Sequence, residues 1–163
     1  MSKKFTPSEK AANDRRVAAD VERHGCHVVS VFDPEDREPT FSYSIGICLS
    51  ARAPEAIVIG LKPSLGHSMV NTYCQRVRSG EVFGRGRLYE GFLDGFPILV
   101  EPVRLRRHEM YTLGCTRFYG DEPYSVVQLV WPSTRGVWPW QKAASDWLRH
   151  HQPMLGRLRP DRP

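Results

Sequence analysis

Three of the four tryptophans lie in one short stretch, QLVWPSTRGVWPWQ, at residues 128 to 141. Trp131, Trp138 and Trp140 alternate there with prolines and a glycine, so this stretch cannot form a regular helix. A wall of aromatic rings on a loop suits a planar ligand, a cation or a proline-rich peptide. The same rings could instead close one end of a hydrophobic core, where each indole N–H needs a partner. The sequence leaves both interpretations open.

Polar and small residues beside two predicted strands form a second candidate group. In the predicted strand at 40–47, the small residues share one face: Ser42, Ser44 and Gly46. Such a face lets a packed helix or a ligand approach closely. Glu55 opens the next predicted strand, where its carboxylate could bind backbone or act as a general acid or base. With Tyr43 as a hydrogen-bond donor, this group supports an enzyme hypothesis on a small molecule.

Soft metal ligands gather at His24-Gly25-Cys26-His27. A zinc site needs further ligands, and the remaining candidates, His67 and His108, lie at no diagnostic spacing. We interpret the stretch as a helix end running into a strand, and we predict no metal site and no cofactor. The cysteines contain no C-x-x-C pair and have apolar neighbours, which predicts reduced and mostly buried thiols: Cys26, Cys48, Cys74 and Cys115.

Composition narrows the class of protein. The 163 residues fit one domain, with 40% hydrophobic and 25% charged residues, as in ordinary globular proteins. No run of about 18 apolar residues and no apolar leader is present, so we expect a cytoplasmic protein without a membrane partner. The net charge of +5 raises the possibility of nucleic-acid binding. The densest basic groups carry no known nucleic-acid motif, so weak binding through them is the least favoured alternative: Arg76, Arg78, Arg85, Arg87, and Arg104, Arg106, Arg107.

The predicted elements fit an α+β fold in a single domain over residues 6–155. Thr6 and Glu9 form a capping box for a helix from about Pro7 to His24 that Gly25 ends. Further helices are predicted from Ser64 to Gly80, at 108–120 and at 142–151, and strands at 26–32, 40–47, 55–61, 81–83, 87–92, 96–105 and 123–131. We expect a mainly antiparallel sheet covered by two or three helices. Residues 1–5 and the basic tail 156–163 are predicted to be disordered.

The order of several motifs resembles that of the bacterial domain of unknown function 4262 family. The motifs are Tyr-Ser-Ile-Gly-Ile at 43–47, Pro-Glu at 54–55 leading to Gly-Leu at 60–61, Gln-Leu-Val-Trp-Pro at 128–132, a helix ending in Gly80, and Gln-Pro at 152–153. The resemblance covers about residues 14 to 155. The family pattern usually has Tyr-Thr-Ile-Gly-Leu and an acidic residue after Trp-Pro, so Ser44, Ile47 and Ser133 are departures.

The resemblance implies a shared fold and no established activity. It directs attention to Tyr43, Ser44, Gly46, Glu55, Gln128, Trp131, Gly136 and Trp140. We expect several of these residues to meet at one end of the sheet.

Three functional hypotheses remain, of which a non-catalytic cytoplasmic binding module for a small molecule or peptide is favoured. Its predicted site residues are Tyr43, Ser44, Gly46, Glu55, Gln128, Trp131, Trp138 and Trp140. The alternative is an enzyme with Glu55 as general acid or base, and the third is nucleic-acid binding. Both a monomer and a homodimer are compatible with the sequence.

Overall fold

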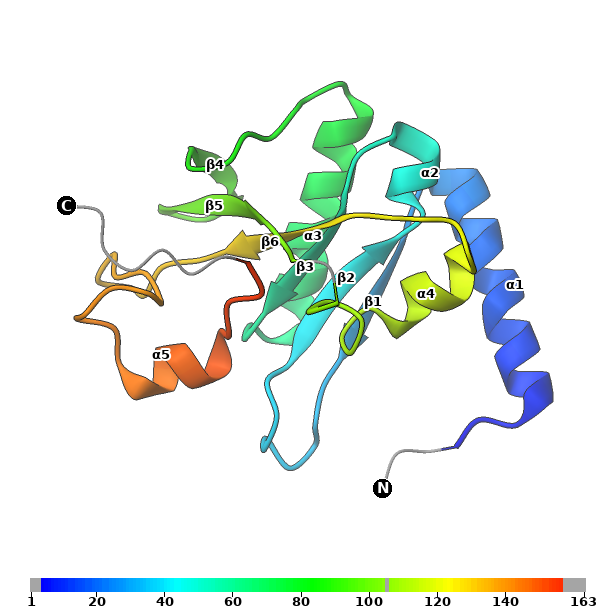
Figure 1. Cartoon of the computed structure of the whole chain (residues 1–163), viewed down its shortest axis with the longest axis horizontal. Coiled ribbons are helices and arrows are strands. Elements are labelled where there is room, and N and C mark those ends of the chain that lie inside the picture. Colours follow the sequence, from blue (N-terminus) through cyan, green and yellow to red (C-terminus); the bar gives the residue numbers. More distant parts are fainter. Residues whose placement is uncertain (1–3, 105, 157–163) are drawn as a thin grey trace.

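A computed structural model describes residues 4–104 and 106–156, and its centre is a six-stranded mixed sheet of order β1-β2-β3-β6-β5-β4 (Figure 1). The strands are β1 His27–Val31, β2 Phe41–Ile45, β3 Glu55–Ile59, β4 Leu88–Leu93, β5 Phe96–Pro102 and β6 Val126–Val130. The helices are α1 Pro7–His24, α2 Ile47–Ala51, α3 Pro63–Arg78, α4 Leu113–Tyr119 and α5 Asp146–His151. The predicted α+β class is confirmed.

Two buried strands form the middle of the sheet. β3 and β6 are buried at every position and run parallel, whereas the other four neighbouring pairs run antiparallel. Burial on both faces explains their continuous apolar sequences. The prediction of a mainly antiparallel sheet is therefore confirmed, and the strand predicted at 55–61 spans Glu55–Ile59.

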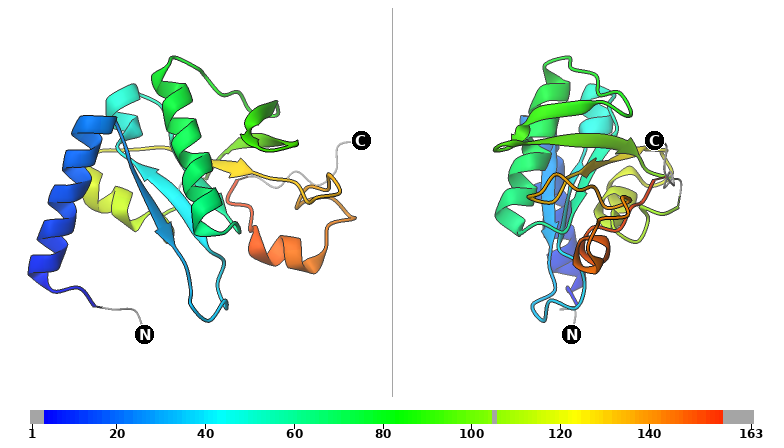
Figure 2. Two further views of the ribbon diagram at one scale, coloured as in Figure 1. Left: turned by 180° about the vertical axis from the view of Figure 1, so that it is seen from behind. Right: turned by 90° about the vertical axis from the view of Figure 1, so that its left-hand side faces the viewer.

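Helices cover both faces of this sheet (Figure 2). α3 packs on one face through an apolar stripe that includes Met69, Val70 and Tyr73. On the other face, Val17 and Val21 of α1 share a core with Cys115 of α4. The two faces thus have separate cores, and α1 lies along the β1 edge (Figure 1).

The first helix follows its local sequence signals. The Thr6 hydroxyl accepts a hydrogen bond from the Glu9 amide, and the Glu9 carboxylate accepts one from the Thr6 amide. Gly25 ends the helix at a φ of 81°, a conformation that glycine adopts without a steric penalty. The capping box and the glycine stop were both predicted correctly because they depend on neighbouring residues alone.

The strand predicted at 40–47 ends earlier, at Ile45. Gly46 turns the chain at a φ of 99°, and the short helix α2 follows from Ile47. Ile47 therefore joins the α3-side core, whereas Tyr43 and Ile45 belong to the core on the other face. Apolar and small residues alternate from β2 through the turn to Ile47. The alternation alone therefore predicted a strand that runs past the turn.

Other boundaries also differ from the predictions. Residues 81–83 form no strand, and the Phe83 ring packs between the rings of Tyr73 and Tyr89. The helix predicted at 108–120 covers only Leu113–Tyr119, and the last helix starts at Asp146, capped by the Ser145 hydroxyl. Residues 1–3 and 157–163, which belong to the termini predicted as disordered, lie outside the described residues.

The small face of β2 receives a helix. A Cβ atom on Gly66 of α3 would lie 2.7 Å from the Ser42 hydroxyl oxygen, so glycine is needed for α3 to lie this close. The interpretation of this face as a helix-packing surface is therefore confirmed. Among the described residues, no helix combines the length and the apolar character that crossing a membrane requires.

Candidate functional site

Glu55 lies at the start of β3 and is fully buried, with 0% of its surface exposed. Its carboxylate accepts hydrogen bonds from the Ser44 hydroxyl at 2.5 Å, the Gly46 amide at 2.8 Å and the Cys48 amide at 3.2 Å. The Tyr119 hydroxyl also donates to it. Ser44, Gly46 and Glu55, three of the predicted site residues, are thus brought together.

This group has the geometry of a structural carboxylate. Burial raises the pKa of Glu55, although the four donors each lower it. With no exposed atom, the carboxyl cannot reach a substrate directly, which general acid or base catalysis requires. Tyr43 makes no hydrogen bond to this carboxyl, because its hydroxyl accepts from the Gly114 amide at 3.0 Å in the core that includes α1 and α4 residues. Burial raises the pKa of Tyr43 to about 12.

The side chains of Gln128 and Trp131 form hydrogen bonds to the backbone in a different part of the molecule. The Gln128 side chain donates to the Pro153 carbonyl and accepts from the Leu155 amide, each at 2.9 Å. The Trp131 indole N–H donates to the Ile59 carbonyl at 2.8 Å, and only 6% of the residue is exposed. Because β3 and β6 run parallel, Trp131 after the end of β6 lies at the opposite end of the sheet from Glu55. The predicted residues therefore do not all meet at one end.

The tryptophans of this segment differ in burial, and their predicted role as a ligand-binding wall stays a prediction. Trp131 closes the core, as a plug would, whereas Trp138 and Trp140 are half-buried and stacked on each other at 5.5 Å between ring centroids. Ser133 stabilises the turn between Trp131 and Trp138, since its hydroxyl accepts hydrogen bonds from the amides of Arg135 and Val137. An acidic side chain could accept the same two bonds, so the departure at Ser133 keeps the turn.

Several arginines of the basic groups are used within the fold. Arg76 pairs with Glu81 at 2.5 Å, and Arg85 pairs with Glu101 at 3.3 Å. Arg107 donates to the Met154 carbonyl at 3.3 Å. The two ion pairs reduce the positive charge available to a phosphate backbone, and nucleic-acid binding stays the least favoured alternative.

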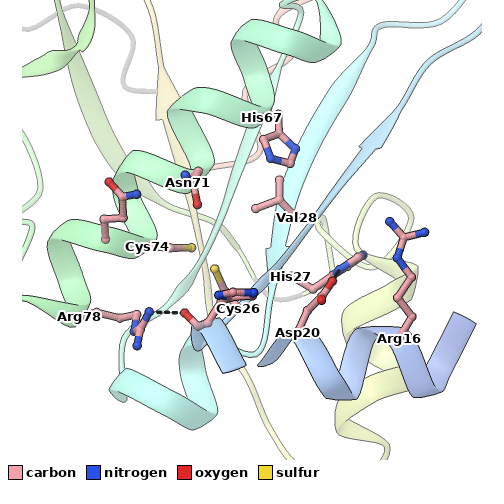
Figure 3. A pocket seen from close by; sticks show the side chains of 11 residues that line it. Arg16, Asp20, Cys26, His27, Val28, His67, Asn71, Cys74 and Arg78 are labelled. Carbon is pink, nitrogen blue, oxygen red and sulfur yellow. Dashed lines mark hydrogen bonds and ion pairs between the residues drawn. The ribbon is translucent and has the colours of Figure 1, made fainter. Parts of the chain in front are cut away.

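The polar pocket, as we name it, lies between α1, the start of β1 and α3 and has a volume of about 520 Å³ (Figure 3). α1 contributes Arg16, Asp20 and His24, and the following segment contributes Cys26 and His27. α3 contributes His67, Asn71, Cys74, Gln75 and Arg78. The volume is within the range of small-molecule sites, about 300–1,000 Å³.

The walls of the polar pocket are joined by specific contacts. Asp20 and His27 hydrogen-bond at 2.6 Å, which links α1 to β1. The Arg78 guanidinium donates to the His24 carbonyl and so meets the carboxyl end of α1, where a cation is favourable. A Cβ atom on Gly25 would lie 2.6 Å from the Arg78 Nε atom. Glycine at this position therefore serves both the helix end and the approach of Arg78.

Two thiols lie at the inner side of the polar pocket. The sulfur atoms of Cys26 and Cys74 point toward each other (Figure 3), and the two residues are 8% and 1% exposed. All four cysteines are free, and three of them are buried. Within residues 4–104 and 106–156, no group of three or more His, Cys, Asp or Glu side chains is arranged to hold a metal ion.

Part of this pocket was visible in the sequence. The stretch at 24–27 was considered as a metal ligand set with His67 as a further candidate, but the other pocket residues of α3 were missed because they come from a distant segment. A signal was present, since His67, Asn71, Cys74 and Arg78 recur at helical spacing. They form a polar face beside the apolar stripe of the same helix.

Comparison with known proteins places this chain in a family. Neither the search of curated proteins nor the search of solved structures found a match. The family model described as Domain of unknown function (DUF4262) matches residues 20–145, most of the 163-residue chain. The match includes every residue of the polar pocket except Arg16. The chain therefore belongs to the DUF4262 family, as its motifs had indicated.

Proposed function

We propose that this protein is a non-catalytic binding module whose ligand is a small anion held in the polar pocket. The observation that carries the proposal is the charge of the lining. Arg16 and Arg78 are permanently positive, and Asp20, the one acidic residue of the lining, already binds His27. The pocket therefore offers a net positive environment without a free carboxylate.

The donors of the polar pocket suit a carboxylate or a phosphate. Guanidinium groups recognise both through paired N–H donors, and such charge-assisted bonds are stronger than neutral ones. Asn71 and Gln75 add amide donors on the α3 side, and His67 adds a ring nitrogen. Because these groups come from both sides of one cavity, an anion between α1 and α3 could contact several at once.

The enzyme alternative finds less support. Its proposed acid or base, Glu55, is fully buried and bound to four donors, so its shell would have to open for proton transfer. Four free cysteines are typical of a reducing compartment, which supports the expectation of a cytoplasmic location.

Titration calorimetry with inorganic phosphate and with citrate tests the proposal at low ionic strength. We expect saturable binding of at least one of these anions at a single site. Arg16→Gln should weaken it about tenfold, since a hydrogen bond to a charged group contributes about 1.5–3 kcal/mol.

The matched control is Arg15→Gln, which removes the same charge from the neighbouring exposed position of α1 outside the pocket. It should leave the affinity nearly unchanged. If neither anion binds, or if both variants weaken binding equally, the proposal is wrong.

A further inference from the structure

The thiols of Cys26 and Cys74 meet although their residues belong to different elements. Cys26 lies between the end of α1 and the start of β1, and Cys74 lies in α3. Their sulfur atoms point toward each other at the inner side of the polar pocket, which both residues line (Figure 3). The pair is therefore both pre-assembled and next to a cavity large enough for small reagents.

The two thiols are not equivalent. Cys26 is 8% exposed, whereas Cys74 is 1% exposed, so a reagent in the pocket reaches Cys26 more easily. The neighbouring Cys74 thiol lowers the pKa of Cys26, and the Arg78 guanidinium lowers it further, against the opposing effects of burial and of the Glu55 and Asp20 carboxylates. The neighbouring Cys26 thiol and burial raise the pKa of Cys74. Cys26 is therefore the thiol assigned to the first attack.

The remaining cysteines provide a contrast within the same chain. Cys115 is 0% exposed, and its thiol donates to the Ser44 carbonyl at 3.1 Å, while burial raises its pKa. Cys48 is half-buried and lies in α2, away from the polar pocket. Neither residue combines a thiol partner with a place in the pocket lining.

We propose that Cys26 and Cys74 form a peroxide-reactive dithiol, with Cys26 as the attacking thiol and Cys74 as the resolving thiol. This inference does not depend on the proposed anion ligand, because it requires only the cavity and the thiol pair. Cys26 lines the pocket with 8% of its surface exposed, and a second cysteine lies beside it, which is the pairing that favours reversible oxidation.

The reaction proceeds in two balanced steps. The Cys26 thiolate attacks one oxygen of hydrogen peroxide and forms a sulfenic acid, while the other oxygen leaves as hydroxide and takes up a proton to become water. The Cys74 sulfur, after losing its proton, attacks the Cys26 sulfur and displaces the second water. Two thiols lose two electrons and two protons, and one peroxide becomes two waters.

Peptide mapping after oxidation tests the inference. The folded, fully reduced full chain is treated with hydrogen peroxide, the remaining thiols are alkylated after unfolding, and peptides are identified by mass spectrometry. We expect loss of two alkylatable thiols and a disulfide that joins the peptides of Cys26 and Cys74. Cys48 and Cys115 should stay alkylatable, and Cys48→Ser should give the same disulfide.

Single substitutions separate the roles of the two thiols. Cys74→Ser should stop at a sulfenic acid on Cys26, which dimedone traps, whereas Cys26→Ser should consume peroxide at least about tenfold more slowly. Circular dichroism reports whether each variant folds. If a variant does not fold, the peptide map of the oxidised wild type decides whether the disulfide between Cys26 and Cys74 forms. Oxidation of Cys48 before Cys26, or retention of all four thiols by the wild type, would overturn the inference.

Discussion

The carboxyl of Glu55 has a structural task that explains its burial. The short helix α2 begins after Gly46, a residue without a side chain that could cap it. Glu55 accepts from the amides of Gly46, the N-cap residue, and of Cys48 in the first turn, and neither amide has a partner within that helix. The carboxyl thus caps α2 from β3, and its loss would leave buried N–H groups unpaired.

The pH dependence of folding gives a test for Glu55. Its pKa is raised above its ordinary value of 4.5 in the folded state, so the unfolded state ionises first as pH rises. The stability that Glu55 contributes is therefore fully present below 4.5 and is lost as pH rises through the raised pKa. Urea unfolding should show that the free energy of unfolding of the wild type falls relative to that of Glu55→Gln as pH rises.

Glu81→Gln is the matched control with the opposite sign. The hydrogen bond from Arg76 lowers the pKa of Glu81, so its contribution is present above 4.5 and is lost as pH falls below that value. The free energy of unfolding of the wild type should therefore rise relative to that of Glu81→Gln as pH rises. If the difference in free energy of unfolding between wild type and variant changes with pH in the same way for both variants, the burial effect assigned to Glu55 is contradicted.

At the scale of elements, a helix or strand was predicted correctly where its start and stop signals lie within its own sequence. α1 was predicted to the residue because its capping box and its glycine stop are contained in its own sequence. α2 was missed because the amide donors at its start are satisfied by Glu55, several residues further along the chain. The two central strands were recognised from continuous apolar residues, but their parallel pairing is a property of the whole sheet.

The contact between α3 and β2 rests on Gly66. Gly66→Ala would place a Cβ atom 2.7 Å from the Ser42 hydroxyl oxygen and 3.3 Å from Val58. Alanine favours a helix by about 1 kcal/mol over glycine, but overpacking costs about 1–3 kcal/mol. Chemical denaturation should therefore show a net loss of up to about 2 kcal/mol.

Two variants check the cause of that loss. Ser68→Ala changes an exposed position of the same helix and should shift stability by less than about 0.5 kcal/mol. Ser42→Ala removes the closest atom, so the penalty of Gly66→Ala should be smaller in that background. A penalty that is independent of Ser42 would show that the crowding lies elsewhere.

At the scale of the molecule, the candidate site depends on pairings that a single sequence does not display. The polar pocket needs α1, β1 and α3 side by side, and only its α1–β1 part is continuous in the chain. Its α3 residues were visible as a polar helical face, but nothing in their spacing names the partner segment. Similarly, Gln128 and Trp131 attracted attention as possible ligand contacts, whereas their side chains are used to close the fold.

The segment after α5 is held against β6 by side-chain amides. Gln152 accepts from the Trp131 amide at 2.9 Å and donates to the Trp131 carbonyl at 2.8 Å. Gln128 makes the corresponding pair of bonds to Pro153 and Leu155. Two glutamine side chains therefore attach this segment to β6 and to the residue that follows it.

Removing this segment should weaken the whole fold, because both glutamine pairs and the buried Leu155 would be lost together. Each buried polar group left unpaired costs about 1–3 kcal/mol, and the exposure of one leucine costs about 1.5–3 kcal/mol. A chain ending at His151 should unfold about 10 °C lower by calorimetry than a chain ending at Gly156, given roughly 2–4 °C for each kcal/mol at this size. The chain ending at Gly156 is the matched control because it keeps every contact named above. Equal unfolding temperatures would mean that β6 is stable without its glutamine-held segment, and that the paired amides serve another purpose.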